Sequence, residues 1–237
     1  EEDYLEQLVM ENTSLSSQMR EYLYIEMSHG VKVSNLAEAV ARELGEDEEF
    51  CRDIAVAGLL HDIGKLLVPD NILNKPGTLT DNEYEIMKHH VNLGYEQIKD
   101  KNLPLPVKEA ILLHHEKCDG SGYPFGLKSP DIPAIAKIIT IADVYDAMTA
   151  SRIYRAPICP FEVVKMMYQD AFTKFDPIYA IPFLKNVVAS YIGTNVKLSD
   201  GRTGNVVLIN DNALDKPIVQ CGNDYVNLSK NSGLSIV

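Results

Sequence analysis

The feature that most constrains the fold is an apolar run that ends in two polar residues. Ile54–Leu60 reads Ile-Ala-Val-Ala-Gly-Leu-Leu, which is typical of a buried helix, and His61 and Asp62 follow at once. An imidazole or a carboxylate that is buried without partners costs several kcal/mol. The chain must therefore fold so that other polar groups meet His61 and Asp62 inside the core.

Other histidines and acids occupy similar places at or inside apolar helical runs. Any one of them alone is more often a satisfied core or surface residue than a metal ligand. Several helices that each bring such a group to one interior are, however, how metal centres form in helical bundles. Imidazoles with a carboxylate suit Fe, Mn, Zn, Co or Ni better than Ca or Mg. The candidates are His29, His61, Asp62, His89, His90, His114, His115 and Asp143.

Hydrophobic periodicity predicts a mainly α fold up to about residue 190. Thr80 and Glu83 form a capping box that opens one of the expected helices. Residues 68–80 contain two prolines and a glycine and are expected to be a loop. The expected helices are Val33–Leu44, Phe50–Leu60 and Asp81–Ile98, with others beginning at Pro106, Pro133, Pro160 and Pro177.

After Tyr191 the pattern changes to short β-prone runs between turns, which predicts a small antiparallel meander. The expected strands are Asn195–Leu198, Asn205–Ile209, Pro217–Gln220 and Tyr225–Leu228. We therefore expect three parts: an N-terminal helix over residues 1–28, a helical catalytic domain over 29–190 and a β appendage over 191–237. The appendage carries no motif that indicates its role.

The N-terminal segment has apolar residues at heptad spacing, with a polar Asn12 in the seam. One interpretation is a parallel homodimer helix that passes on a signal from an upstream sensor domain. The other is an amphipathic helix that lies on its own domain. Because the first residue is Glu1, the chain is expected to be a fragment. The seam consists of Leu5, Leu8, Asn12, Leu15, Met19 and Tyr22.

Composition excludes several classes of partner. The formal net charge is −12, which argues against non-specific binding to DNA, RNA or anionic membranes, although not against a small anion at a local cation cluster. No apolar run approaches the roughly 18 residues that would cross a bilayer. Four scattered cysteines without a CxxC pair favour a reducing, cytoplasmic location.

A series of motifs then occurs in order, and over residues 29–185 the chain resembles the HD-GYP family, bacterial cyclic di-GMP phosphodiesterases of the HD superfamily. The resemblance implies an HD-type helical bundle around a metal centre. The motifs include His61-Asp62-Ile-Gly-Lys65, Lys75-Pro76-Gly77, Met87-Lys88-x-His90-x-x-x-Gly94, His114-His115-Glu116-x-x-Asp119-Gly-Ser-Gly122-Tyr123-Pro124 and Ile141-Ala142-Asp143.

The resemblance also implies roles for individual residues. His29, His61, Asp62 and Asp143 would hold one divalent ion, Fe or Mn, and Asp62 would bridge to a second ion held by His90, His114 and His115. His89 has no counterpart and is expected at the surface. Lys65 and Asp62 would be catalytic. Substrate would contact Gly122, Tyr123, Pro124, Arg152 and Arg155, although a solvated face is the alternative for the two arginines.

The implied reaction is hydrolysis of cyclic di-GMP to pGpG, and further to GMP, by a water that two metal ions activate. Family members with a third ion carry a glutamate where this chain has Ile25, so two ions are expected and formation of GMP is doubtful. Ile153 replaces a proline of the family pattern. The alternatives are a cyclic dinucleotide receptor without turnover and a hydrolase of mononucleotides or of cyclic GMP-AMP.

Overall fold

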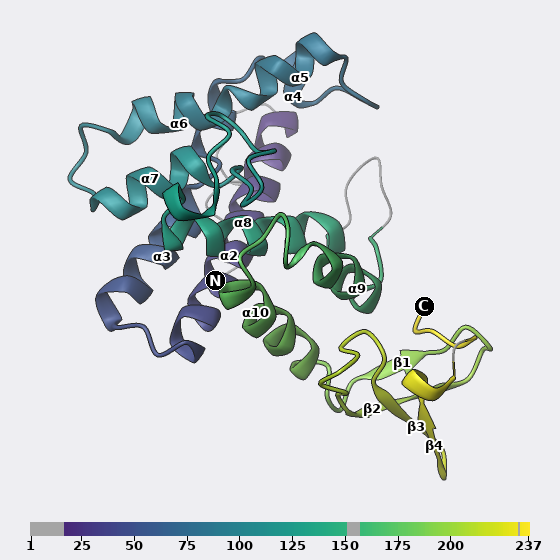
Figure 1. Ribbon diagram of the computed structural model, residues 1–237. Helices are drawn as coiled ribbons and strands as arrows, with labels where there is room; N and C mark the ends of the chain where they lie inside the picture. The colour runs from purple at the N-terminus through teal and green to yellow at the C-terminus, as the bar shows by residue number, and fades with distance from the viewer. Residues whose placement is uncertain (1–16, 151–156, 232) are drawn as a thin grey trace. The chain divides into compact units, whose positions relative to one another are not determined.

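The computed structural model describes residues 17–150, 157–231 and 233–237 (Figure 1). The expectations for residues 1–16 and for Arg152, Ile153 and Arg155 lie outside this part. The chain divides into two compact units, Glu1–Asp146 and Ala147–Val237. The expected fold class is confirmed, because the chain is mainly helical and ends in a small antiparallel sheet.

The first unit is built from helices that pack through apolar faces. Val33, Ala37, Val40 and Ala41 on α2 are buried, which is the face expected from their spacing. The elements are α2 (Ser17–Glu43), α3 (Glu48–Leu60), the 3₁₀ helix η1 (Ile63–Leu67), α4 (Asp70–Leu73), α5 (Asp81–Lys88), α6 (His90–Ile98), α7 (Leu105–Leu113) and most of α8 (Ala134–Thr149).

Local signals in the sequence set several helix starts. The Asp47 carboxylate accepts a hydrogen bond from the Phe50 N–H at 2.8 Å and so caps α3. Thr80 and Glu83 form the expected capping box at the start of α5. Gly45 follows α2 with a φ of 79°, a left-handed conformation that favours glycine.

Two expectations about local structure were incomplete or wrong. The expected helix Asp81–Ile98 is two helices, α5 and α6, which meet at His89. Residues 68–80 are not entirely loop, because Pro69 fixes an extended turn from which the one-turn helix α4 begins. Helix α2 is continuous across residue 28.

The second unit combines two helices with the sheet. Helices α9 (Pro160–Asp170) and α10 (Pro177–Ala189) begin at prolines, as expected. The four strands pair antiparallel in the order β1-β2-β3-β4. Val206, Val219 and Val226 are buried on one side of this meander. The strands are β1 (Asn195–Lys197), β2 (Thr203–Leu208), β3 (Ile218–Cys221) and β4 (Asp224–Asn227).

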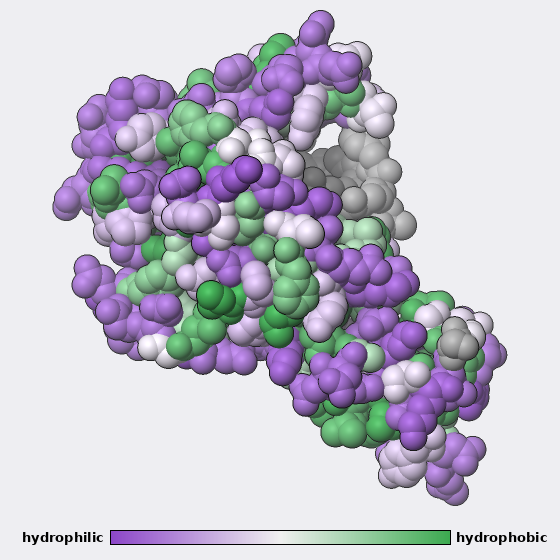
Figure 2. Space-filling model, in the orientation of Figure 1, coloured by the Kyte–Doolittle hydropathy of each residue, from purple (hydrophilic) through white to green (hydrophobic). Residues whose placement is uncertain are grey.

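The described surface is mixed in hydropathy. Hydrophilic and apolar residues are interspersed on the face shown in Figure 2. Among the described residues, no helix combines the length and the apolar character that a bilayer crossing requires.

Candidate metal centre and substrate loop

Three histidines owe their orientation to the ends of helices. The last carbonyl groups of a helix lack partners within it. The Nδ1–H groups of His61, His90 and His114 each donate to the carbonyl oxygen three residues earlier, at 2.7, 2.8 and 2.9 Å. Because a carbonyl can only accept, the proton is on Nδ1 and the Nε2 lone pair is left for a ligand.

The break at His89 explains how His90 takes part in this arrangement. In a continuous helix the Met87 carbonyl would accept from the Val91 N–H. Because α5 ends at Lys88, the Met87 carbonyl instead accepts from His90 Nδ1. His89 itself is exposed, as expected. The break between α5 and α6, which the hydrophobic periodicity did not predict, therefore orients the candidate ligand His90.

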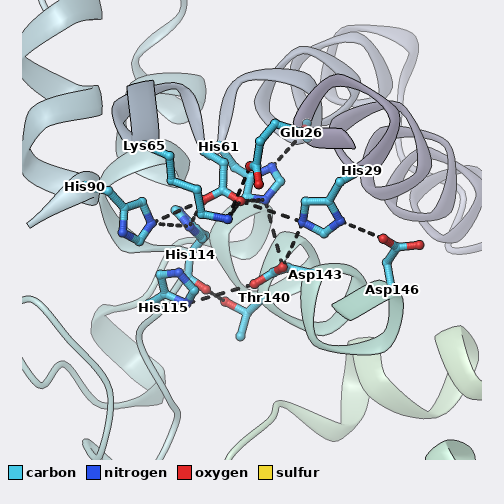
Figure 3. Close-up of polar contacts among 12 residues, drawn as sticks. Glu26, His29, His61, Lys65, His90, His114, His115, Thr140, Asp143 and Asp146 are labelled. Atoms are coloured by element: carbon cyan, nitrogen blue, oxygen red, sulfur yellow. Dashed lines mark hydrogen bonds and ion pairs between the residues drawn. The ribbon is translucent and has the colours of Figure 1, made fainter. Parts of the chain in front are cut away.

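The first group of candidate ligands consists of His29, His61 and Asp143. They come from α2, from the C-terminal cap of α3 and from α8. His29 Nε2 lies 3.2 Å from Asp143 Oδ1, and the rings of His29 and His61 are 5.1 Å apart. Three segments that are distant in sequence thus converge on one point (Figure 3).

The second group consists of Asp62, His90, His114 and His115. His90 Nε2 lies 3.2 Å from Asp62 Oδ1 and 3.5 Å from His114 Nε2. The His115 ring packs 4.2 Å from the His114 ring, measured between centroids. In both groups the potential ligand atoms all lie within 4.8 Å of one another.

Asp62 connects the two groups through its two carboxylate oxygens. Oδ1 faces the second group, 3.7 Å from His114 Nε2. Oδ2 faces the first group, 3.1 Å from His61 Nε2 and 3.7 Å from His29 Nε2. A carboxylate in this position can contribute one oxygen to each of two ions.

The site has a specific fit to metal ions. Among the described residues, His61 Nε2 and Asp62 Oδ1 are buried side-chain atoms without a hydrogen-bond partner. Buried polar atoms are normally satisfied, so both need a group that protein atoms do not supply. A cation between the lone pairs of imidazoles and a carboxylate meets this need.

The protonation states also suit metal ligands. Burial lowers the pKa of His114 to about 4 and holds that of His115 well below its usual 6.5, so both imidazoles are neutral at pH 7. Burial opposes ionisation of Asp143, yet the hydrogen bond with His29 and the neighbouring imidazoles outweigh it and lower its pKa. Its carboxylate therefore stays charged.

His29 differs because two carboxylates flank its ring. Its Nδ1 lies 2.6 Å from Asp146 Oδ2, opposite the contact of Nε2 with Asp143. Burial disfavours the charged ring, but its hydrogen bonds with Asp143 and Asp146 outweigh burial and raise its pKa to about 9. These acids favour a positive charge here, and Asp146 orients the ring as a carboxylate behind a metal-bound histidine does.

Lys65 lies beside the candidate bridging carboxylate. Its Nζ donates to Asp62 Oδ2 at 2.6 Å and to Glu26 Oε2 at 3.3 Å. Burial disfavours its charge, but Asp62 and Glu26 more than compensate and raise its pKa, so Lys65 is a cation at neutral pH. Ile25, which has no ligand atom, is 43% exposed, and Glu26 turns toward Lys65 (Figure 3).

The glycine-rich loop folds back onto the second group. A Cβ at Gly122 would lie 2.5 Å from the His115 carbonyl oxygen, so only glycine allows this approach. The Tyr123 ring stacks on His115 with a centroid distance of 4.6 Å. Pro124 follows in the same loop, partly buried. The expected pocket residues of this loop thus lie at the candidate centre.

Three supporting acids were missed as functional residues. Glu116 is 2% exposed, and its carboxylate accepts from the backbone N–H groups of Phe125, Gly126 and Leu127, which holds the loop. Asp146 lies one helical turn after Asp143 on the same face of α8, a spacing that could have identified it. Glu26 follows Ile25, the position at which the family pattern has a glutamate, and this neighbourhood left a shifted role for Glu26 open.

Stability of the metal-free protein is expected to fall between pH 6.5 and about 4. The folded-state pKa of His114 is about 4, below its unfolded value, so its contribution is present above pH 6.5 and is lost on acidification. The loss is on the order of 3 kcal/mol. The contribution of His29, with a folded pKa of about 9, is lost only at alkaline pH.

Chemical denaturation in the presence of a chelator, at half-unit steps from pH 7 to 4.5, measures this loss. His114→Asn should make the profile shallower, because asparagine does not titrate, while the remaining slope comes from His115, whose pKa burial also lowers. A wild-type profile that is flat across this window would contradict the burial of a neutral His114.

Known proteins with similar sequences act on cyclic dinucleotides. The sequence profile of the HD domain family matches residues 3–178. A cyclic di-GMP phosphodiesterase of Pseudomonas aeruginosa is 39% identical over 201 residues, covering 84% of this chain and 48% of the relative. A 3′3′-cGAMP-specific phosphodiesterase of Vibrio cholerae is 38% identical over 152 residues, covering 63% of this chain and 29% of the relative.

A solved structure supports the fold. An HDGYP protein from Bdellovibrio bacteriovorus superposes with a TM-score of 0.58 at 23% identity, covering 80% of this chain and 62% of that one. At this identity the likeness concerns the fold alone. The chain spans about half the length of the Pseudomonas relative.

Proposed function

The chain belongs to the HD domain family, and from that premise we propose that it is a metal-dependent phosphodiesterase that hydrolyses cyclic di-GMP to pGpG. The observation that carries this proposal is the carboxylate of Asp62, which directs one oxygen to each of two ligand groups. Two divalent ions would neutralise phosphate charge and activate water. The similarity to curated phosphodiesterases supports the same reaction.

Different residues of this chain would bind the metal ions, the phosphate and the rest of the substrate. The first group and the second group would each hold one ion, with Asp62 shared between them. Lys65, a buried cation next to Asp62, would bind an oxygen of the scissile phosphate. Tyr123, stacked on His115, would form one wall of the substrate pocket.

Two ions fit this site better than three. The described residues form two ligand groups, and Glu26 is engaged by Lys65. We propose Fe or Mn for both sites, since imidazole and carboxylate ligands suit them. With two ions, pGpG is the expected end product.

The remaining expectations stay proposals. The heptad pattern supports a homodimer through residues 1–28, with a sensor domain upstream. Arg152 and Arg155 would add positive charge against the dinucleotide. The domain limits at residues 29–190 and 191–237 and the cytoplasmic location are retained as sequence-based predictions.

A second candidate substrate is 3′3′-cGAMP, which the Vibrio relative is named for. Both dinucleotides present the same pair of phosphodiesters to the metal centre. The choice between guanine and adenine therefore depends on base contacts rather than on the ligand groups.

We expect the chain, reconstituted anaerobically with Fe(II) or Mn(II), to convert cyclic di-GMP to pGpG. Chromatography with mass detection identifies the product, and parallel reactions with 3′3′-cGAMP compare the substrates by kcat/KM. Chelator treatment should abolish turnover, and re-addition of metal should restore it. Binding of cyclic di-GMP by the metal-loaded chain without any product would identify a receptor instead.

A further inference from the structure

An aromatic and cationic cluster beside the candidate centre joins Tyr123 to two residues that have no role so far. It consists of Tyr84 and Lys88 on α5 together with Tyr123 of the glycine-rich loop. Lys88 Nζ lies 5.4 Å from the centroid of the Tyr84 ring and 5.8 Å from that of Tyr123. One ammonium group thus contacts two aromatic rings.

The cluster extends outward from the second ligand group. Tyr123 stacks on His115, with an angle of 28° between the ring planes. Lys88 is followed by His89 and then by the candidate ligand His90. Tyr84 lies four residues before Lys88, so both side chains share one face of α5. A ligand at the centre would therefore meet Tyr123, then Lys88, then Tyr84.

These side chains are accessible to a ligand. Tyr84 is 49% exposed, so part of its side chain is open to solvent. The Lys88 side chain is 26% exposed, and its ion pair with Glu85 at 2.7 Å involves a carboxylate side chain that is 65% exposed. Such surface pairs contribute little, so a phosphate can displace Glu85 at small cost.

The chemistry of the cluster matches half of a cyclic dinucleotide. Only one of the two phosphates can occupy the metal centre during hydrolysis, so the other is an anion that needs a cation elsewhere. Lysine binds phosphate as a point charge. An exposed aromatic ring can stack on any nucleobase, because every base has an aromatic face.

We propose that Tyr84, Lys88 and Tyr123 form a subsite for the non-scissile half of the substrate, in which Lys88 binds the second phosphate and Tyr84 stacks on a base. This inference rests on the proposed function and specifies which residues distinguish a cyclic dinucleotide from a simple phosphodiester. Stacking does not separate guanine from adenine, so the subsite accepts either base.

Steady-state kinetics of the metal-loaded chain test the subsite with two substrates. Cyclic di-GMP has a second phosphate and bases, whereas bis(p-nitrophenyl) phosphate has neither a second phosphate nor a base. Lys88→Gln and Tyr84→Ala should raise KM for cyclic di-GMP roughly tenfold, leave kcat within about twofold and leave kcat/KM for the model diester unchanged. Tyr84→Phe, which keeps the ring, should behave like wild type.

Lys99→Gln is the matched control. Lys99 pairs with Glu96 at the same spacing, but at the opposite end of α6 from His90. It should change neither substrate's kinetics. The inference is overturned if Lys88→Gln and Tyr84→Ala keep the wild-type KM, or if both lose activity on the model diester as well, which would indicate a structural role.

If the proposed function is wrong, the wild-type chain itself gives a different result in these assays. If wild type binds cyclic di-GMP without hydrolysing it, the same variants are compared by calorimetric Kd, with a roughly tenfold weakening expected. If wild type hydrolyses only the model diester and does not bind cyclic di-GMP, the inference falls together with the substrate assignment.

Discussion

Replacing Asp62 with alanine is expected to abolish stable metal binding and to reduce turnover by roughly 10³-fold, about 4 kcal/mol of activation free energy. The reason is geometric, because Asp62 lies between the two ligand groups, with Oδ2 at 3.1 Å from His61 Nε2 and Oδ1 at 3.2 Å from His90 Nε2. Its loss separates one shared centre into two incomplete ones. Metal content per chain by mass spectrometry, together with turnover of cyclic di-GMP, measures both effects.

Two variants separate this effect from misfolding. Removing a buried charge also leaves Lys65 and His61 with fewer partners, which can destabilise the fold. Asp62→Asn keeps the side-chain volume and a carbonyl oxygen, so it should remain helical by circular dichroism while losing metal. Asp53→Ala, on helix α3, which precedes Asp62 in the chain, should keep metal and turnover. Full metal content in Asp62→Asn would refute a bridging role.

The positions of the candidate ligands could be predicted because each one interrupts an apolar pattern. His61 follows a buried helix, and Asp143 lies within one, so their polar groups had to meet inside the core. Helical periodicity also placed the buried face of α2. These features depend on local sequence, which determines which face of a helix is apolar.

The supporting interactions could not be predicted because they depend on tertiary contacts. The capping box of Thr80 and Glu83 predicts the start of α5, but no signal in the sequence predicts that the helix ends at Lys88. Histidine is tolerated inside helices, so His89 does not predict a break. The consequence of the break is visible only in the structure, where the Met87 carbonyl accepts a hydrogen bond from His90 Nδ1. Glu116 likewise has backbone partners nine to eleven residues away.

A close approach of two backbone segments explains why the sequence motifs have glycine at positions 64 and 94. A Cβ at Gly64 would lie 1.9 Å from the carbonyl oxygen of His90 and 2.4 Å from the backbone nitrogen of Gly94. A Cβ at Gly94 would in turn lie 3.2 Å from the nitrogen of Gly64. The backbones of η1 and α6 are therefore in contact, and this contact brings Asp62, just before η1, to His90 at the start of α6.

Gly64→Ala is accordingly expected to destabilise the metal-free chain by about 3 kcal/mol or more and to impair metal binding. The added methyl group must push η1 from α6, which moves Asp62 Oδ1 away from its position 3.2 Å from His90 Nε2. Urea denaturation gives the free energy of unfolding, and titration with Mn(II) gives the affinity. Gly233→Ala, where a Cβ meets nothing within 4 Å, is the control. A loss below about 1 kcal/mol with unchanged affinity would show that the two backbones need not touch for the centre to form.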